Sequence, residues 1–306
     1  MLSRRRLLGS AAILGAGLAS SGNVTAQPAK RTIVDAQVHL WKAESDSWKW
    51  VPGAKPQMPE PFTIEKLLPM MDEAGVDRAV IVPPSWPGDR NDYALEAARR
   101  YPKRFAVMGR IPLKNPETAA LLAKWKEQPG MLGVRLTFLG TAQAWLTDGT
   151  ADWFWPEAEK AGLPVMFLTA GHNAQLAPVA ERHPRLQLIA DHMGVAGETI
   201  KEGRLADAIN QTAALARYPN VSVKLSAAPN NSSQPYPFGD FAPYIKQVFE
   251  AYGPRRCYWG TDMTNGFDKA TYRQRITHFT QELPFLSEQD KDWVMGKAIL
   301  ERLNWV

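Results

Sequence analysis

Short apolar runs alternate along most of the chain with segments in which apolar residues recur every three or four positions. Runs rich in β-branched and aromatic residues have the length of strands, and the stretches that begin at Thr63 and Asp92 have the period of a helix. The pattern predicts strands at Thr32–His39, Val76–Val82, Phe105–Ile111, Gly133–Phe138, Pro164–Leu168, Leu186–Ala190, Val221–Leu225 and Cys257–Gly260.

Helix start signals support this reading. Asn115 stands before Pro116, and Ser287 stands three residues before Asp290, as in a capping box. Alternating strands and helices over roughly 250 residues favour an α/β protein built as a single (β/α)8 TIM barrel. An open doubly wound sheet is the alternative, but no G-x-G-x-x-G stretch supports a dinucleotide fold.

The composition is that of a globular domain. The chain has 306 residues, of which 45% are hydrophobic and 22% charged. Its formal charge of +5 owes three charges to Arg4, Arg5 and Arg6, and residues 1–26 contain no acid. The remaining +2 is spread without a basic run, so nucleic-acid binding is not expected. Cys257 is the single cysteine, which excludes an intrachain disulfide.

Residues 1–26 have the pattern of a processing signal. Paired arginines in "SRRRLLG" precede a short apolar run, and small residues lead to Ala26, after which cleavage is expected. The segment resembles a twin-arginine export signal, which predicts contact with the twin-arginine export machinery and a periplasmic mature protein. The run is too short for a confident membrane span, so no stable membrane anchoring is expected. An uncleaved anchor or an ordinary secretory signal is the alternative. Residues 27–306 are expected to form one domain.

Polar residues cluster where the predicted strands end, which is where a barrel carries its active site. Asp191 precedes His192, so on an extended strand its side chain would face the other way and have at most a supporting role. The cluster comprises Gln37, His39, Trp41, Arg135, Thr137, His172, Asp191, His192, Lys224, Ser226 and Asp262.

The stretches "DAQVHLW", "ADHMG", "NVSVKLS" and "YWGTDM" together resemble the amidohydrolase-related superfamily. They are most similar to the branch that includes 2-pyrone-4,6-dicarboxylate lactonase and the sugar lactonases that act on fuconolactone and rhamnonolactone. The resemblance runs from about Ile33 to the C-terminal helix and implies a TIM-barrel hydrolase of ester bonds that takes a small-molecule lactone, carboxylated or derived from a sugar.

The resemblance implies a role for several residues. Asp262 matches the aspartate that orients or deprotonates the attacking water. His39 and His192 match histidines that bind metal in some members and polarise the scissile carbonyl in metal-free lactonases. Arg135 matches an arginine that can hold a substrate carboxylate, and His172 is a looser match to a metal-binding histidine.

Two departures from the family pattern bear on metal and substrate. Gln37 stands where metal-dependent members carry the first histidine of His-x-His, and Lys42 stands where sugar lactonase relatives often carry an acid. A glutamine oxygen is a poor zinc ligand beside imidazole, so no metal or other cofactor is expected.

The chemistry of lactone opening needs a positioned water, a base and donors for the developing oxyanion. Asp262 can act as the base if partial burial of its carboxylate raises its pKa toward the working pH. His39, His192 and the Gln37 amide can donate to the carbonyl oxygen. We expect the substrate to contact Gln37, Trp41, Arg135, His172 and Lys224.

Two alternatives stay open. One is a mononuclear zinc hydrolase or decarboxylase, with one Zn held by three or four of His39, His172, His192 and Asp262. The other is a degenerate barrel that binds a small molecule without turning it over.

The export signal yields the first prediction. Replacing Arg4 and Arg5 by lysine is expected to keep the precursor in the cytoplasm, because the export reading depends on the arginine pair and not on positive charge alone. Fractionation of cells that produce wild type and variant measures this, and an unchanged periplasmic yield would contradict a twin-arginine signal.

Overall fold

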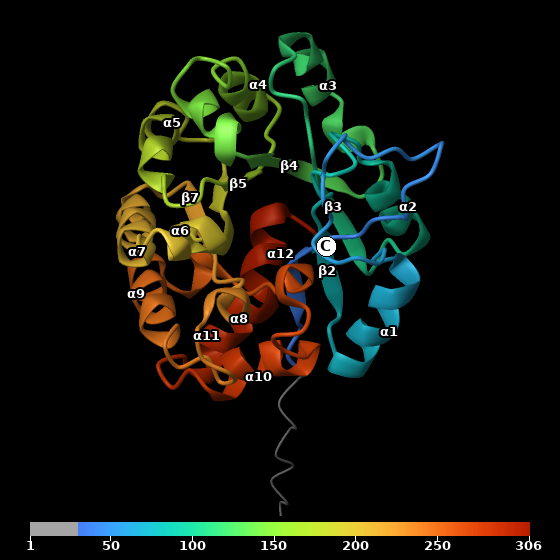
Figure 1. The fold of residues 1–306 in the computed structure, drawn as a ribbon. Coiled ribbons are helices and arrows are strands. Elements are labelled where there is room, and N and C mark those ends of the chain that lie inside the picture. Colours follow the sequence, from blue (N-terminus) through green and yellow to red (C-terminus); the bar gives the residue numbers. More distant parts are fainter. Residues whose placement is uncertain (1–29) are drawn as a thin grey trace, which may run out of the picture. The chain divides into compact units, whose positions relative to one another are not determined.

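A computed structural model describes residues 30–306. In these residues eight parallel strands pair in sequence order, and helices surround them (Figure 1). Each predicted strand overlaps an observed one, so the barrel prediction is confirmed. The strands are β1 Val34–Val38, β2 Arg78–Ile81, β3 Phe105–Gly109, β4 Met131–Thr137, β5 Val165–Leu168, β6 Leu188–Ala190, β7 Val221–Lys224 and β8 Cys257–Tyr258.

Two backbone hydrogen bonds bring the last strand segment to the first. Ala36 N–H donates to the Trp259 carbonyl at 3.1 Å, and Asp262 N–H donates to the Gln37 carbonyl at 3.0 Å. β8 is shorter than predicted because Trp259 N–H turns away from the sheet and donates to the carbonyl of Val294 at 2.8 Å.

The α-helices follow the strands in alternation. The capping box at Ser287 is confirmed, since its hydroxyl accepts from Asp290 N–H. The helix start at Pro116 is a 3-10 turn, Pro116–Thr118, ahead of α3. The helices are α1 Ile64–Ala74, α2 Asp92–Arg100, α3 Ala119–Leu122, α4 Phe154–Lys160, α5 Ala177–Arg182, α6 Gly197–Lys201, α7 Leu205–Ala214, α8 Ala228–Asn231, α9 Ala242–Tyr252, α10 Tyr272–Gln281, α11 Glu288–Asp292 and α12 Ala298–Leu303.

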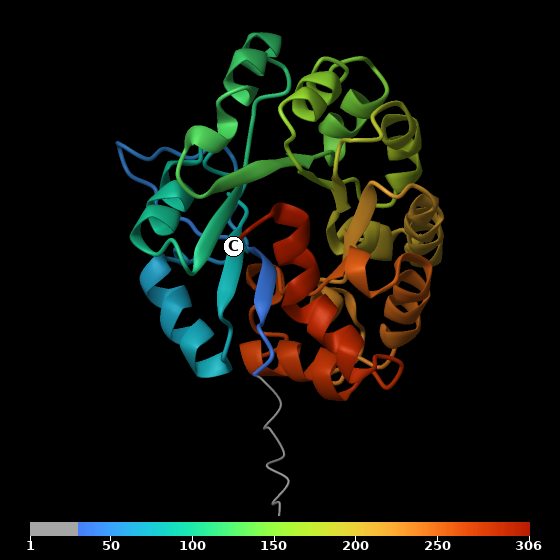
Figure 2. The same ribbon diagram turned by 180° about the vertical axis from the view of Figure 1, so that it is seen from behind.

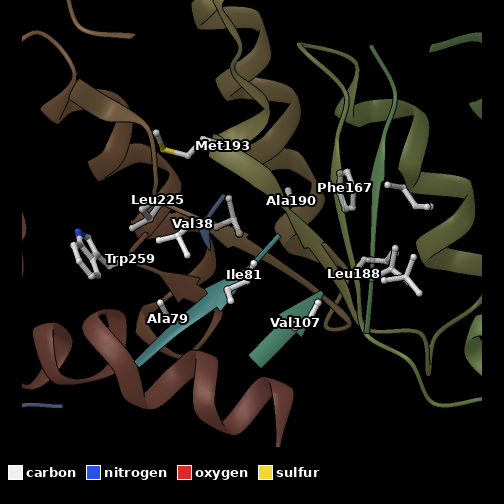
Figure 3. Packing of buried hydrophobic residues seen from close by; sticks show 14 of the residues in the cluster. Val38, Ala79, Ile81, Val107, Phe167, Leu188, Ala190, Met193, Leu225 and Trp259 are labelled. Atoms are coloured by element: carbon white, nitrogen blue, oxygen red, sulfur yellow. The ribbon is translucent and has the colours of Figure 1, made fainter. Parts of the chain in front are cut away.

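Two buried clusters form the core. The larger one lies between the strands and the surrounding helices, and Figure 3 shows part of it, including Val38, Ile81 and Phe167. The smaller cluster joins Val34 and Ala36 of β1 to side chains of other strands and of α12. α12 lies across the middle of the ring of strands (Figures 1 and 2), so it fills the barrel from one end.

A β-bulge in β1 changes which residues face inward. Asp35 pairs with Ala79, but Val38 pairs with Ile81, so β1 has one residue more than β2 between these points. Ala36 lies in the smaller cluster, inside the barrel, and Val38 lies in the larger cluster, between the strands and the helices. The extra residue makes this change of side possible. The bulge thereby directs Gln37 and His39 into the mouth of the barrel.

Within residues 30–306 no helix is both long and apolar enough to span a membrane. The export signal predicted for residues 1–26 lies outside the described residues.

His278 on α10 generates a prediction about acid stability. Its ring is 1% exposed, neither ring nitrogen has a hydrogen-bond partner in the part of the chain that the structure describes, and burial lowers its pKa to about 4. Unfolding restores a pKa near 6.5, so the unfolded chain binds an extra proton between these values. The contribution of His278 to the free energy of unfolding should therefore be fully present above about pH 6.5. It should fall by about 3 kcal/mol as the pH drops to about 4.

The measurement is urea unfolding of wild type and His278→Leu across that pH range. The variant should lose this part of the pH dependence, so the difference between the two proteins should change with pH. Parallel curves would show that His278 does not titrate between the two states.

Candidate active site

The carboxyl ends of the strands open onto a cavity of about 440 Å³. Five of the eight residues expected to act in catalysis or to contact the substrate line it, namely Gln37, His39, Arg135, His192 and Asp262, and Thr137 of the strand-end cluster lines it as well. Polar side chains that sequence reasoning missed complete its wall: Gln57, Glu198, Lys201, Asn230, Asn231 and Asn265. They come from loops and short helices whose approach to the site depends on tertiary structure.

The other three predicted site residues lie elsewhere. Trp41 is fully buried and packs edge to face against Trp86 at a centroid distance of 4.9 Å, and it is Trp86 that lines the cavity. His172 lines a neighbouring hollow with Glu202 and Arg204. Lys224 is fully buried and does not reach the cavity wall. These three side chains lie outside the wall of this cavity, which contradicts the direct substrate contact expected of them.

Asp262 stands at the centre of the site. Its Oδ1 lies 3.0 Å from His39 Nε2, and its Oδ2 lies 3.5 Å from His192 Nε2. Asn265 Nδ2 donates to Oδ2 at 2.6 Å, which fixes the carboxylate plane. One carboxylate is thus flanked by two imidazoles at the floor of the cavity.

The pKa of Asp262 departs from the sequence-based expectation. Burial acts to raise it, but the His192 and His39 rings and the Asn265 amide outweigh burial and hold the pKa below its usual value. The expected rise toward the working pH is therefore wrong in direction. Asp262 is therefore ionised at neutral pH and can accept a proton.

Gln37 occupies the space between the three central side chains. Its Nε2 lies 3.2 Å from His192 Nε2, and 3.5 Å from both His39 Nε2 and Asp262 Oδ1. Its Oε1 accepts a hydrogen bond from Lys224 Nζ at 2.6 Å. Because a lysine ammonium only donates, the amide oxygen must face Lys224 and the amide N–H groups must face the site.

The hydrogen bonds also fix the proton positions on both rings. His39 Nδ1 lies 2.7 Å from the Val82 carbonyl, which only accepts, so Nδ1 carries a proton. The 3.0 Å contact of its Nε2 with Asp262 needs a further shared proton. His192 Nε2 accepts from Gln37, so its proton is on Nδ1 and points at Ser226 Oγ, 2.7 Å away. Burial lowers the pKa of His192, in keeping with a neutral ring.

Beneath the site lies a buried ion cluster. Asp191 Oδ1 is 2.8 Å from Lys224 Nζ, and its Oδ2 accepts from Arg135 Nε at 3.2 Å. Burial acts to raise the pKa of Asp191, but the Lys224 and Arg135 charges outweigh it and lower the pKa. The facing expected for the Asp191 side chain was wrong, because the chain leaves the extended conformation at Asp191 and enters the 3-10 turn Asp191–Gly194. Its contacts with Lys224 and Arg135 suit the supporting role expected of it.

Left-handed backbone marks the same edge of the barrel. Asp262 has φ 46°, and His192 and Met193 have φ 52° and 57°. Such values are costly for residues other than glycine and gather where surrounding structure enforces them. Here they turn Asp262 and His192 from the strand ends toward each other.

Asp35 connects the two strands that carry Gln37 and Asp262. Its buried carboxylate accepts from Gln37 N–H, from the N–H and hydroxyl of Thr261, and from the Tyr272 hydroxyl at 3.0, 2.8, 2.6 and 2.8 Å. Burial raises its pKa despite these donors. The group holds the bulge of β1 against the turn that precedes Asp262.

A metal ion does not fit the donor set in this arrangement. A metal needs lone pairs from its ligands, whereas Gln37 directs N–H hydrogens at the point where His39, His192 and Asp262 converge. Among residues 30–306 no group of three or more His, Cys, Asp or Glu side chains is arranged to hold a metal ion.

Comparison with known proteins identifies the family. The family model described as "Amidohydrolase" matches residues 34–301. The chain belongs to the amidohydrolase family. The resemblance inferred from the strand-end motifs is thereby confirmed.

Individual relatives refine the comparison. An L-fucono-1,5-lactonase from Burkholderia ambifaria is 26% identical over 238 residues, which cover 75% of this chain and 79% of the relative. A Burkholderia multivorans amidohydrolase crystal structure with bound zinc is similar at TM-score 0.75 and 18% identity, over 89% of this chain and 99% of that one. A putative 2-pyrone-4,6-dicarboxylic acid hydrolase from Pseudomonas putida is similar at TM-score 0.72 and 19% identity, over 90% and 98%.

Asp35 generates a prediction about the closure of the barrel. Asp35→Ala leaves four donors without their acceptor, so we expect the free energy of unfolding to fall by about 3 kcal/mol or more. Asp35→Asn keeps one acceptor oxygen and should lose less.

Asp77→Ala is the matched control, since Asp77 accepts from the N–H of Ile33, the residue before the same strand, in a partly buried position. Its cost is expected to be about 1 kcal/mol. Chemical denaturation measures all three variants. Equal losses for Asp35→Ala and Asp77→Ala would contradict the closing role of Asp35.

Proposed function

We propose that this amidohydrolase opens a lactone or similar cyclic ester by water attack, and that it does so without a metal ion. The observation that carries the proposal is the Asp262 carboxylate, held between two imidazoles and an amide at the floor of a strand-end cavity. The fucono-lactonase relative supports a lactone as the substrate, as does the similarity to a pyrone dicarboxylic acid hydrolase.

Asp262 serves as the base. Its ionised carboxylate takes a proton from the water as the water oxygen attacks the lactone carbonyl carbon. When the ring carbon–oxygen bond breaks, the proton passes from Asp262 to the leaving oxygen, which becomes the hydroxyl of the product. A low pKa makes Asp262 a weak base, and the reactive carbonyl of a lactone compensates for that weakness.

His39 and Gln37 supply the donors for the oxyanion. The N–H of His39 Nε2, which faces Asp262 in the absence of substrate, can donate to the carbonyl oxygen of a bound lactone. One N–H of the Gln37 amide donates to His192. The 3.5 Å contacts of the amide nitrogen with His39 and Asp262 are too long for good hydrogen bonds, so the second N–H is available to substrate. The donor role expected for His192 does not suit a ring that accepts at Nε2. We assign it instead to holding Gln37.

The cavity wall favours a polar substrate. Arg135 is 94% buried and faces the cavity, and its planar guanidinium suits a carboxylate or vicinal hydroxyls. The amides of Gln57, Asn230 and Asn231 offer neutral donors and acceptors. Trp86 adds an apolar face. Such a wall suits an oxygen-rich lactone, either sugar-derived or carboxylated.

A zinc-dependent hydrolase is the second candidate, because a structurally similar amidohydrolase has been crystallised with bound zinc. The orientation of the Gln37 amide favours the metal-free mechanism. Metal content of the purified protein, together with activity on a lactone panel with and without chelator, separates the two. Failure to turn over any sugar-derived or carboxylated lactone would contradict the proposed substrate class.

The base generates a quantitative prediction. Asp262→Asn keeps the shape but removes the proton acceptor, so kcat should fall by on the order of 10² to 10⁴. Dialysis of wild type against chelator should leave kcat unchanged. Steady-state kinetics on the best lactone of the panel measures both. Loss of wild-type activity on dialysis, with recovery on zinc addition, would show that the reaction needs metal.

A further inference from the structure

Lys224 is a buried ammonium with two acceptors. It is 0% exposed and contacts Gln37 Oε1 at 2.6 Å and Asp191 Oδ1 at 2.8 Å. Burying a charge is costly unless it is paired, and Asp191 supplies the pairing. The contact with Gln37 is not needed for charge balance, and it is the one that reaches the active site.

The contacts form a chain in which each group determines the next. Lys224 only donates, so Gln37 must present its oxygen to Lys224 and its N–H groups to the site. His192 Nε2 must then accept, and its proton must lie on Nδ1, facing Ser226. A group outside the cavity thus sets the hydrogen-bond polarity inside it.

We propose that Lys224 is a positioning residue whose ammonium locks the Gln37 amide, and that this lock sets the His192 tautomer and holds an N–H donor where a divalent cation would otherwise bind. The tautomer and the exclusion of metal depend only on the described contacts. The effect on turnover rests on the proposed lactone hydrolysis.

Loss of the Lys224 ammonium should reverse the direction of the hydrogen bond between Gln37 and His192. Without Lys224 the Gln37 amide can turn its oxygen toward His192, which would then place its proton on Nε2. In the presence of a cation, a shift of the His192 proton back to Nδ1 and release of the proton shared by His39 and Asp262 to solvent would leave four lone pairs, from Gln37, His39, His192 and Asp262, facing one point. Such a set can hold a divalent metal ion, although an amide oxygen is its weakest member.

Lys224→Met is the informative variant, since methionine fills a similar volume in an apolar environment. Arg135→Met is its matched control. It removes the other cation that contacts Asp191 but leaves the bond between Lys224 and Gln37 intact. Any effect of lost positive charge alone should appear in both variants.

The first readout is the nitrogen NMR spectrum of protein with ¹⁵N-labelled histidine. Wild type and Arg135→Met should show His192 as the Nδ1–H tautomer, and Lys224→Met should lose that single form. A wild-type His192 that carries its proton on Nε2, or an unchanged tautomer in Lys224→Met, would overturn the proposal.

The second readout is cobalt binding, followed by its visible absorption in the purified protein without substrate. Lys224→Met should bind cobalt about 10- to 100-fold more tightly than wild type, the range typical of groups that orient ligands. Arg135→Met should gain much less. Equal gains in both variants would mean that charge alone excludes the ion.

Gln37→Glu tests the same inference if Lys224→Met does not fold. The carboxylate keeps the contact with Lys224 but presents an acceptor to His192, so His192 should carry its proton on Nε2 and cobalt binding should rise. Retention of the Nδ1–H tautomer would overturn the proposal.

Kinetics separates this inference from the proposed function. Lys224→Met should lower kcat about 10- to 100-fold with little change in KM, because Lys224 acts through a donor to the oxyanion and does not reach substrate. If no lactone is turned over but the tautomer and cobalt results hold, the proposed function fails and the role of Lys224 stands.

Discussion

The carboxylate of Asp35 holds the meeting point of the first and last strands, and the active site depends on that meeting. β1 carries Gln37 and His39, whereas Asp262 follows β8 more than two hundred residues later. A carboxylate that accepts four hydrogen bonds from both sides fixes the bulge of β1 against the turn before Asp262. The distances of 3.0 to 3.5 Å between Asp262 and the two histidines follow from that registration.

The polarity of buried hydrogen bonds then organises the site. Lys224 only donates and the Val82 carbonyl only accepts, so the protons on His192 and His39 are determined from outside the cavity. Two buried cations, Lys224 and Arg135, flank the buried carboxylate of Asp191, whereas the Asp262 carboxylate shares a proton with His39. Each buried carboxylate of the barrel mouth thus has a positively charged or proton-donating neighbour.

The parts of the structure that sequence patterns predicted are those with local causes. Buried parallel strands are nearly continuous apolar runs, so all eight were found, and a capping box is a four-residue signal. The strand-end rule placed Gln37, His39, Arg135, His192 and Asp262 in the cavity. Their positions at strand ends follow from period and order, whereas the roles expected of them rest on the resemblance to the family.

The errors have non-local causes. A bulge in β1 and a turn at Asp191 break the alternation on which facing arguments depend. Trp86 and not Trp41 reaches the cavity because the two indoles pack edge to face with Trp86 on the cavity side, and no pattern in either segment predicts that order. The pKa of Asp262 was misjudged because burial was weighed without its neighbours. Lys224 was expected at the substrate, since its depth depends on the whole barrel.

The proposed reaction without a metal ion has a consequence for substrate reactivity. A metal ion lowers the pKa of its bound water and polarises a carbonyl strongly, whereas an amide N–H and one imidazole offer less stabilisation to an oxyanion. Asp262, with its low pKa, is also a weak base. A site of this kind needs a carbonyl that is already electrophilic and a leaving group that departs readily. The proposed site therefore favours a cyclic ester, whose carbonyl is activated, over an amide.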